Sequence, residues 1–366
     1  MVDIGEYLGR RKSEGLLRSL NPGLRGVDFS SNDYLGLSGH PRLLEGAKKA
    51  IEKFGTSSTG SRLMSGDSFL FHELEEKVAR FKCKESALVF NSGYQANAGI
   101  VSSLIQKGDC VFSDRLNHAS IIDGIMLSGA KIFRFRHNDA DHLETLLKTE
   151  RGKYKDALIV TETIFSMDGD RPPLRRMVDL KEKYDCLLMV DEAHATGIFG
   201  ASGGGIVEEE GLQDRVDFVM GTFSKGLGSF GAYIAASREI IDYLVNRARS
   251  FIYSTALPPG VIGANLAALD IVREEPERRR SLLANALYFR ERLGIKGESQ
   301  IVPVVIGDQY MTVEAAKRLL EKGFRVVPVR PPTVPPGQSR LRISLTYNHT
   351  KDILDRLVDE LLEIRI

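Results

Sequence analysis

A lysine in a glycine-rich segment is the first residue of this sequence whose setting suggests chemistry. Lys225 lies in FSKGLGSFGA, directly after the apolar run DFVMGT at 217–222, and two hydroxyl residues, Thr222 and Ser224, stand close to it. An unhindered lysine amine beside hydroxyl groups is suited to form an imine with a phosphorylated aldehyde. Because most lysines are only solvated surface charges, this interpretation depends on which other residues accompany it.

An acid and a histidine follow a second apolar run. Asp191 comes directly after CLLMV, and His194 comes three residues later. A lone buried carboxylate is costly unless it is paired, and a protonated heteroaromatic nitrogen would supply the partner. His194 could then reach a neighbouring ring oxygen. The alternatives are two hydrogen-bonded structural residues, or a metal site with further ligands that the sequence does not reveal.

A third apolar run, ALVF at 87–90, leads into NSGYQANAG. Ser92, Gly93 and Tyr94 open a predicted helix there, whose free N–H groups and dipole suit an anion such as phosphate, although an ordinary capped glycine turn would look the same. A nicotinamide dinucleotide is not favoured, because NSGYQANAG lacks the G-x-G-x-x-G spacing. Together the three segments offer a phosphate site, a carboxylate for a ring nitrogen and an imine-forming lysine. Pyridoxal 5'-phosphate, an electron-sink cofactor, requires that set.

The elements that must position these residues alternate between strands and helices. Continuously apolar strands imply a sheet buried on both faces, and parallel neighbours need helical crossovers. We therefore predict an α/β fold with a mainly parallel sheet in an α/β/α sandwich, in which ligands gather at the carboxyl ends of the strands. The predicted strands are 87–90, 110–113, 131–135, 157–162, 186–192, 217–222 and 231–236, and the predicted helices are 67–81 with Asp67 as N-cap, 94–106, 119–128, 141–148 and 174–184.

The pattern changes from about residue 257. Long helical stretches run to 292, and after them come predicted strands at 301–306, 324–329 and 340–345, with helices at 311–322 and 350–364. This pattern is typical of a separate small α+β domain. We therefore predict three parts, which are an N-terminal segment at 1–45, a large cofactor-binding domain at 46–256, and a linker helix with a small C-terminal domain at 257–366.

The bulk properties argue against several classes of function. The 366 residues carry 50 Lys and Arg against 49 Asp and Glu, without a basic stretch, so nucleic acid is not an expected partner. The N-terminus lacks the apolar core of a signal peptide, and no stretch approaches the roughly 18 apolar residues of a membrane span. The three cysteines lack CxxC spacing, which argues against a disulfide framework or a zinc site. We expect a cytoplasmic protein that contacts no membrane and binds no metal.

Three longer segments carry a resemblance to a known family. They are FSSNDYLGL at 29–37, GSRLMSGDSFLFHELEE at 60–76 and RPPTVPPGQSRLRISL at 330–345, within matches that run from about Phe29 to His349. Through them the chain resembles the α-oxoamine synthases, which are fold-type-I pyridoxal-phosphate enzymes, and most closely their biotin-pathway members. The resemblance implies a decarboxylative condensation of L-alanine with a pimeloyl thioester, carried by coenzyme A or by acyl carrier protein, which gives 8-amino-7-oxononanoate.

The resemblance also implies roles at the cofactor. Lys225 would hold the cofactor as a Schiff base and act as the general base, Asp191 would pair with the ring nitrogen, and His118 of DRLNHAS would stack on the ring. His118 would also polarise the thioester carbonyl. Ser166 and His194 would lie near the ring oxygen. The remaining candidates are Ser92, Gly93, Tyr94, Thr222 and Ser224 in the phosphate region, and Thr255, which would reach the phosphate of the neighbouring subunit and so implies a homodimer.

Substrate-binding residues are implied in the same way. Arg342 would clamp the carboxylate of the amino acid, since a planar guanidinium fits a carboxylate bidentately, and Thr333 would line the pocket. Asn32 is assigned to the substrate as well, and Arg18 is chosen as the N-terminal arginine that contacts it, although a solvated helix residue would look the same. Arg340 shares a strand face with Arg342, so only one of the two need be functional.

Other functions remain open on the sequence. Glycine C-acetyltransferase shares every cofactor residue and differs in the amino acid and the acyl donor, and an α-oxoamine synthase of mixed activity fits as well. Serine palmitoyltransferase and 5-aminolevulinate synthase are further alternatives. A non-catalytic partner subunit should have lost Lys225, which is present. An aminotransferase of the same fold would exchange amino groups without a thioester. The remaining histidines, expected at surface or capping positions, are His40, His72, His137, His142 and His349.

Overall fold

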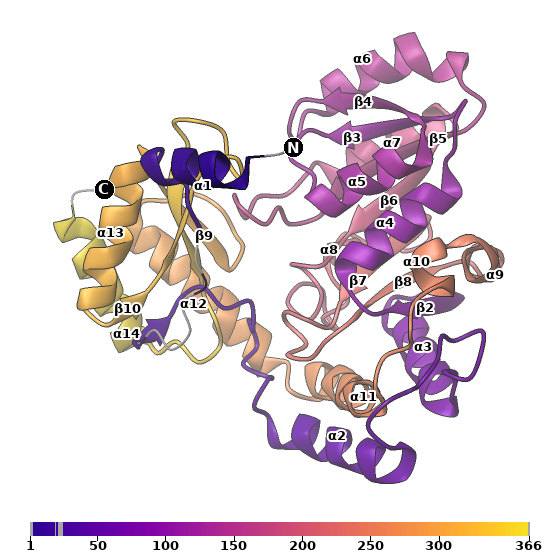
Figure 1. Ribbon diagram of the computed structural model, residues 1–366, viewed down its shortest axis with the longest axis horizontal. Coiled ribbons are helices and arrows are strands. Elements are labelled where there is room, and N and C mark those ends of the chain that lie inside the picture. The colour runs from indigo at the N-terminus through magenta and orange to yellow at the C-terminus, as the bar shows by residue number, and fades with distance from the viewer. Residues whose placement is uncertain (1–2, 19, 21–24, 365–366) are drawn as a thin grey trace. The chain divides into compact units, whose positions relative to one another are not determined.

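The computed structural model describes residues 3–18, 20 and 25–364 and forms two compact units (Figure 1). The larger unit consists of Asp33–Ser166 and Asp170–Ser281. The smaller unit consists of Met1–Asn32, Met167–Gly169 and Leu282–Ile366. The two compact units divide the chain at residues other than the predicted domain boundaries at 45/46 and 256/257. Those domain boundaries stay a prediction.

The larger unit is built on a seven-stranded sheet, which confirms the predicted α/β class with a mainly parallel sheet. Neighbouring strands are parallel except at β8, which runs antiparallel to both β2 and β7. In spatial order the strands are β2 (Ser86–Phe90), β8 (Ala232–Ala236), β7 (Phe218–Thr222), β6 (Leu187–Asp191), β5 (Ala157–Glu162), β3 (Cys110–Asp114) and β4 (Lys131–Phe135).

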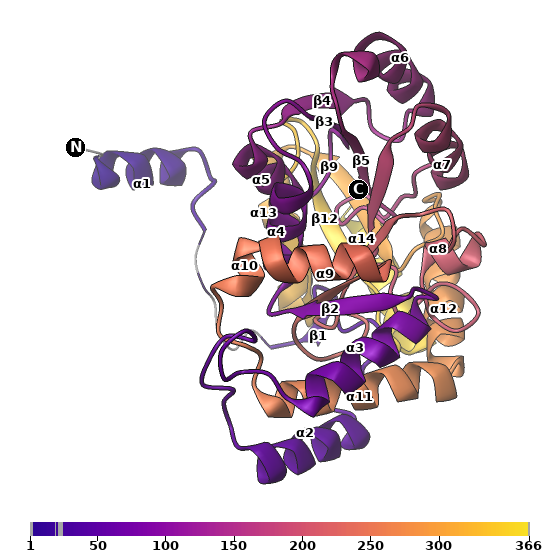
Figure 2. The ribbon, with the colours of Figure 1, turned by 90° about the vertical axis from the view of Figure 1, so that its right-hand side faces the viewer.

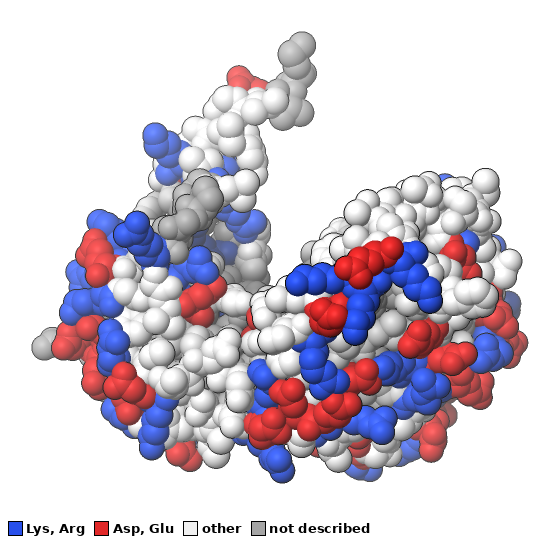
Figure 3. Space-filling view, turned by 90° about the horizontal axis from the view of Figure 1, so that it is seen from below, with Lys and Arg blue, Asp and Glu red and all other residues white. Residues whose placement is uncertain are grey.

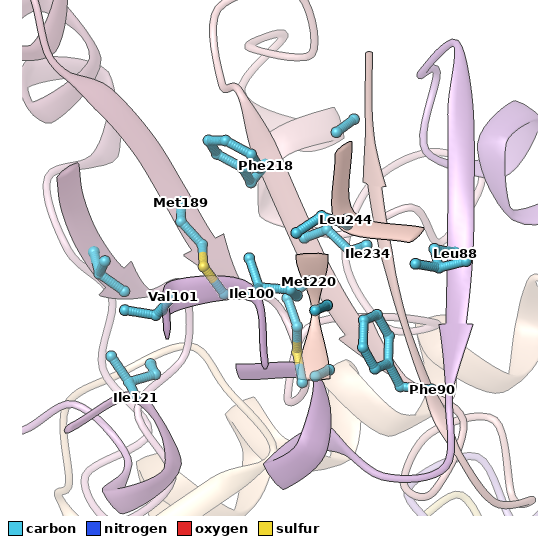
Figure 4. Packing of buried hydrophobic residues seen from close by; sticks show 14 of the residues in the cluster. Leu88, Phe90, Ile100, Val101, Ile121, Met189, Phe218, Met220, Ile234 and Leu244 are labelled. Atoms are coloured by element: carbon cyan, nitrogen blue, oxygen red, sulfur yellow. The ribbon is translucent and has the colours of Figure 1, made fainter. Parts of the chain in front are cut away.

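Apart from the edge strand β4, whose residues Lys131 and Arg134 are exposed, the sheet is buried on both faces, as its apolar strands predict. Figure 4 shows side chains from β2, β6, β7 and β8 packed against α4 (Gly93–Leu104), α5 (Ala119–Ser128) and α9 (Arg238–Arg247). Alternate residues such as Val89 and Val190 are also buried, so a second layer covers the opposite face. The other helices of this unit are α2 (Pro41–Phe54), α3 (Phe69–Phe81), α6 (Ala140–Glu150), α7 (Leu174–Lys183), α8 (Ile206–Glu209), α10 (Arg249–Ile252) and α11 (Pro259–Glu274), with a 3-10 turn at Arg151–Lys153.

Helix α2 was not predicted, and it packs on α11, which in turn packs on α3 (Figure 2). Two glycines allow the close approach. A Cβ atom added to Gly46 would lie 2.6 Å from the carbonyl oxygen of Gly263, and one added to Gly263 would lie 2.3 Å from that of Gly46. Such distances exclude any side chain at either position, so the two helix backbones are in direct contact.

The predicted cap of the helix at 67–81 is wrong. The helix begins at Phe69, and its N-cap is Ser68, whose side chain makes no capping hydrogen bond. Asp67 instead accepts hydrogen bonds from Arg62 (2.5 Å) and pairs with His72 (2.7 Å). The Asp67 carboxylate is therefore held by two partners that can carry a positive charge. Hydrogen bonds from such partners are stronger than those from the neutral backbone N–H groups at a helix end.

The smaller unit contains a three-stranded antiparallel sheet and a short parallel pair. The sheet has the order β11 (Val327–Val329), β12 (Ser339–Ser344), β9 (Ile301–Gly307), and β1 (Val27–Asp28) pairs with β10 (Phe324–Arg325). The strand predicted at 324–329 is thus divided at Val326, because its halves pair with different strands. The helices of this unit are α1 (Ile4–Ser13), α13 (Gln309–Glu321) and α14 (Lys351–Glu363). Helix α12 (Glu277–Leu293) runs across the boundary of the two units in sequence.

The surface and the helices show two further features. On the face in Figure 3, basic and acidic side chains are intermixed, as the balance of 50 against 49 predicts. Within residues 3–18, 20 and 25–364, no helix combines the length and the apolar character needed to cross a membrane.

Candidate active site

The loop that carries Lys225 is closed by hydrogen bonds between its two ends. It follows β7, and the Thr222 hydroxyl donates to the carbonyl oxygen of Gly231 (2.7 Å). The backbone N–H of Ser224 donates to the Thr222 hydroxyl (3.1 Å), and Ser224 itself is exposed. Lys225 is half-buried, and its Nζ atom lies 3.0 Å from Nε2 of His194. The amine is thus presented from a fixed loop and beside an imidazole.

Asp191 ends β6 and is 5% exposed. Its Oδ2 atom accepts a hydrogen bond from the Asn97 amide (2.8 Å), and its Oδ1 atom accepts one from the backbone N–H of Ala193 (2.8 Å). Both donors are neutral groups, so the carboxylate charge is oriented by them and not neutralised. A buried carboxylate in that state is suited to pair with a protonated ring nitrogen.

His194 is buried between Lys225 and Tyr34. The hydroxyl of Tyr34 lies 2.6 Å from Nδ1 of His194, and Tyr34 is fully buried. Tyr34 belongs to the segment FSSNDYLGL, but its role was not predicted. Its contact with one ring nitrogen orients the imidazole so that the other nitrogen faces the lysine.

His118 joins the same set of residues through Asn97. Its ring Nδ1 atom lies 2.7 Å from the Ser120 hydroxyl, to which the Asn97 amide also donates (3.0 Å). Asn97 therefore connects Asp191 with His118, although the sequence does not reveal this link. The side chain of His118 remains exposed and able to meet a ligand, and partial desolvation lowers its pKa, against the attraction of Asp191.

Glu162, which was also not predicted, is a second buried acid at a strand end. It is the last residue of β5, it is 3% exposed, and its Oε1 atom accepts a hydrogen bond from the backbone N–H of His118 (2.7 Å). Burial raises the pKa of Glu162 to about 8, the nearby Asp191 carboxylate adds to this effect, and Lys225 opposes it. Its surroundings therefore favour the protonated form of Glu162.

The predicted phosphate segment opens α4. The Ser92 hydroxyl accepts a hydrogen bond from the backbone N–H of Gln95 (3.2 Å), so Ser92 is the N-cap, with Gly93 and Tyr94 in the first turn. A Cβ atom at Gly93 would lie 3.0 Å from the terminal methyl group of Met220, so a larger residue there would have to displace that flexible side chain. The hydroxyl of the half-exposed Tyr94 donates to the Asp123 carboxylate.

Two further candidates lie in loops of the larger unit. Ser166 is half-buried in the loop after β5, and Thr255 is exposed in the segment before α11. The carbonyl oxygen of Thr255 accepts a hydrogen bond from the Asn91 side chain (2.7 Å), just before the phosphate segment. The proposed roles of both residues stay predictions.

The predicted substrate residues lie in the smaller unit and form two groups. The buried guanidinium of Arg342 donates from both Nη atoms to the Asn32 side-chain oxygen (3.2 Å each) and from Nη1 to the Ser344 hydroxyl (2.6 Å). The exposed Arg18 donates to the Thr333 hydroxyl (3.0 Å). These contacts bring the four candidates together in pairs, and their substrate roles stay predictions.

Arg340, the alternative to Arg342, is bound to a carboxylate of the protein itself. It forms an ion pair with Asp168, within the smaller unit, and the side chain of Arg340 is 5% exposed. Because this pair occupies Arg340, Arg342 is the better candidate for the carboxylate of a substrate.

Of the five histidines expected at surface or capping positions, two are placed differently. His40 does cap α2, accepting a hydrogen bond from the backbone N–H of Arg42 (3.2 Å). The prediction for His349 is wrong, since this residue is 5% exposed and its ring stacks on Phe29 with 4.0 Å between centroids. Burial lowers the pKa of His349 to about 4. His137 is half-buried between two carboxylates, where tertiary contacts that no spacing reveals hold it.

Comparison with known proteins extends this description. A family model described as aminotransferase class I and II matches residues 25–361. The 8-amino-7-oxononanoate synthase of Geotalea daltonii is 47% identical over 384 residues, which cover 100% of this chain and 98% of the relative. The crystal structure of 8-amino-7-oxononanoate synthase from Francisella tularensis is 30% identical, with a TM-score of 0.80 over 93% of this chain and 99% of that one. A serine palmitoyltransferase variant from S. paucimobilis with a bound PLP–myriocin aldimine is 30% identical, with a TM-score of 0.92 over 99% of this chain and 96% of that one.

The side chains at the strand ends fit pyridoxal 5'-phosphate, which is the cofactor of this chain. Lys225 would supply an amine for the aldehyde, Asp191 would supply a carboxylate for the ring nitrogen, and His194 would supply a donor for the ring oxygen. The first turn of α4 would supply N–H groups for the phosphate. By the family model that matches it and by its full-length similarity to named relatives, the chain belongs to the aminotransferase class I and II family and, within it, to the family of the 8-amino-7-oxononanoate synthases.

Proposed function

We propose that the protein catalyses the condensation of L-alanine with a pimeloyl thioester, with loss of carbon dioxide, to give 8-amino-7-oxononanoate and a free thiol in biotin biosynthesis. The observation that carries this proposal is the 47% identity over the whole chain to a synthase of that name. The arrangement of Lys225, His194 and Asp191 supports it, because it provides the base and the ring contacts that the reaction needs.

When bound, pyridoxal phosphate supplies an electron sink for the negative charge that develops at Cα of the amino acid. Lys225 is the only side chain in this set whose amine can both hold the cofactor and move the Cα proton, so it acts as the general base and later returns a proton. Asp191 holds a proton at the ring nitrogen, which keeps the sink effective. The Asn97 amide and the backbone N–H of Ala193 fix the direction of that carboxylate.

His118 and Arg342 act on the substrates in this proposal. The exposed His118 ring would stack on the cofactor ring when the cofactor is bound, and it would donate to the thioester carbonyl, where charge develops during attack. Arg342 binds the carboxylate of alanine through its planar guanidinium, and Asn32 holds that guanidinium by its side-chain oxygen. Arg18 and Thr333 contribute to the substrate pocket of the smaller unit.

The assembly and the compartment are finer proposals. The protein acts as a homodimer in which the exposed Thr255 reaches the phosphate site of the neighbouring subunit, and the acyl group arrives on coenzyme A or on acyl carrier protein. The protein acts in the cytoplasm. Its free thiols at Cys83, Cys110 and Cys186 support this location, because a reducing compartment keeps cysteines in that state.

The experiment that tests the proposed function measures carbon dioxide release by the cofactor-loaded protein with two substrate pairs. L-alanine with pimeloyl thioester should give rapid release and 8-amino-7-oxononanoate. A preference for glycine with acetyl thioester would show a glycine C-acetyltransferase instead. Running the first pair with pimeloyl-coenzyme A and with pimeloyl-acyl carrier protein identifies the carrier, and sedimentation of the same sample tests the dimer.

A further inference from the structure

A histidine that the proposed mechanism does not use is bound on both sides by carboxylates. His137 follows β4 in the larger unit. Its Nδ1 atom lies 2.9 Å from Oδ1 of Asp114, and its Nε2 atom lies 2.8 Å from Oδ2 of Asp170. Ionised carboxylates only accept hydrogen bonds, so both ring nitrogens must donate, and only the imidazolium form can do that. We define the His137 clamp as His137, Asp114 and Asp170.

Asp114 connects the clamp with the turn that carries His118. It is the last residue of β3 and is fully buried. The same Oδ1 atom that meets His137 accepts a hydrogen bond from the backbone N–H of Leu116 (2.8 Å), and the carbonyl oxygen of Asp114 accepts one from Asn117 (3.2 Å). The turn that ends at His118 is therefore folded around the Asp114 carboxylate.

Asp170 connects the clamp with the loop that carries Ser166. Its carbonyl oxygen accepts a hydrogen bond from the backbone N–H of Phe165 (3.1 Å), which closes the loop around Ser166. The Phe165 ring also meets the His137 ring edge-on, with 4.4 Å between centroids and 90° between planes. The clamp thus contacts both segments that bear proposed cofactor residues.

We propose that His137 is a positioning residue, which as an imidazolium bound to Asp114 and Asp170 holds the His118 turn and the Ser166 loop in the places that cofactor binding requires. The proposal rests on the cofactor roles assigned to His118 and Ser166 under the proposed function. His137 itself touches neither cofactor nor substrate in this mechanism.

Asn138 forms a second, uncharged link between Asp114 and Asp170 beside the link through His137. This second link limits how much the loss of His137 should disturb the structure. The backbone N–H of Asn138 donates to Asp114 Oδ2 (2.9 Å), and its side-chain amide donates to Asp170 Oδ2 (2.8 Å). Asn138 has a φ of 53°, a left-handed conformation that asparagine tolerates better than most residues. Because Asn138 still joins the two acids when His137 is replaced, the fold should survive and the loss should be confined to the precision of the site.

The clamp has a defined pH dependence. Burial alone would lower the pKa of His137, but the hydrogen bonds and charges of Asp114 and Asp170 outweigh it and raise the pKa to about 9. The charged groups that face the ring are these two acids, from the end of β3 and from the loop after β5, while Phe165 and Asn138 carry no charge. The clamp is therefore intact at neutral pH and is lost as the pH rises through about 9.

The first test is direct titration of histidine in the holoenzyme by NMR, with isotope-labelled imidazoles assigned through the variant His137→Gln. The His137 signals should titrate near pH 9. In Asp170→Asn, where one charge is removed and an acceptor is kept, its pKa should fall by about one unit. Titration of the wild-type ring near its ordinary value of about 6.5 would overturn the clamp.

The second test measures the dissociation constant of pyridoxal phosphate and the pH profile of turnover. His137→Gln should weaken cofactor binding about tenfold, since a charged hydrogen-bond pair is replaced by a neutral one. The control is His142→Gln in the first turn of α6, which should bind the cofactor like wild type, because the His142 ring accepts a hydrogen bond from the backbone N–H of Arg136 and is not part of the clamp. The alkaline limb of the profile should move to lower pH in Asp170→Asn.

The outcomes separate the clamp from the proposed function. If His137→Gln lowers the melting temperature but keeps wild-type cofactor affinity, and Asp170→Asn keeps the wild-type alkaline limb, His137 has only a structural role and the proposal is overturned. If wild type makes no 8-amino-7-oxononanoate, the proposed function fails, yet the titration and the cofactor dissociation constant still decide whether the clamp exists.

Discussion

The hydroxyl of Tyr34 lies 2.6 Å from Nδ1 of His194, while Nε2 of the same ring lies 3.0 Å from the Lys225 amine. The two contacts use opposite sides of the imidazole, so the tyrosine sets the orientation of the ring that the lysine meets. Tyr34 comes from the chain segment before α2, far from the strands that carry the other site residues.

Replacing Tyr34 by phenylalanine should therefore reduce turnover more than it reduces stability. Loss of one hydrogen bond should cost about 1 kcal/mol in the free energy of unfolding, and misorientation of His194 should lower kcat/KM roughly fivefold or more. Denaturant titration and steady-state kinetics measure the two effects. A wild-type kcat/KM in a folded Tyr34→Phe protein would show that the contact does not orient the ring.

Lys225→Ala should remove the visible absorbance of the lysine-bound cofactor and lower turnover about 10²- to 10⁴-fold, because both the covalent link and the general base are lost. Lys155→Ala, at a side chain that is 82% exposed, is the matched control and should keep both signals. An unchanged spectrum of Lys225→Ala would show that another amine holds the cofactor.

Asn97→Ala should weaken the cofactor site, since the amide donates to both Asp191 and Ser120. The buried acceptors left behind should cost about 1–3 kcal/mol in unfolding free energy. Cofactor affinity should fall as well, which equilibrium dialysis can measure. Asn285→Ala removes an amide donor to His349 in the smaller unit and should leave cofactor affinity at the wild-type value, so equal losses in both variants would count against a special role of Asn97.

Glu162→Gln should change how stability depends on pH. The pKa of Glu162 is raised to about 8, so this residue stabilises the fold fully below its ordinary pKa of about 4.3, and the contribution is lost as the pH rises through about 8. Glutamine resembles the protonated acid and keeps an acceptor for His118. Between pH 5 and pH 8 the free energy of unfolding of wild type should fall as Glu162 ionises, whereas glutamine cannot ionise. The variant should therefore gain stability relative to wild type by about the free energy that wild type loses over this range. Denaturant unfolding at several pH values measures this difference, and Glu52→Gln at an exposed position is the control. A difference in unfolding free energy between Glu162→Gln and wild type that does not change with pH would contradict the prediction.

Arg342→Lys should raise the KM for L-alanine by about tenfold or more, because an ammonium cannot reproduce the bidentate contact with a carboxylate. Arg340→Lys should affect stability through its pair with Asp168 and leave this KM near the wild-type value. If the two effects are exchanged, Arg340 is the residue that binds the substrate.

Part of the site could be predicted because its residues follow uninterrupted apolar runs. Asp191 comes directly after such a run, and Lys225 and Gly93 follow the ends of β7 and β2 by three residues each. In a mainly parallel sheet these ends meet at one edge. Glu162 ends β5 in the same way, so the same rule would identify it. Asn97 and Tyr34 follow no local rule, since they reach partners 94 and 160 positions away in the chain.

The fold was predictable to a similar extent. The strands of the larger unit and their mainly parallel order follow from periodicity. Periodicity does not reveal the reversed direction of β8. The length of the loop between β7 and β8 does indicate it, because this loop is too short for a helical crossover. Helix α2 was missed although its sequence indicates a helix, since Pro41 stands in its first turn and Leu43 and Ala50 lie on its buried face. Likewise, the long helical stretch after 257 is divided by Pro276, which ends α11 before α12 begins.

The reversed strand also bears on how the protein is made. Among the described strands, β8 is the sole neighbour of β2, although β2 is synthesised before any other strand of this sheet. A nascent chain therefore carries an unpaired, apolar edge until Ala232–Ala236 leaves the ribosome, and such edges favour association with other chains. The phosphate segment after β2 gains its support at that moment, directly after the lysine has been made.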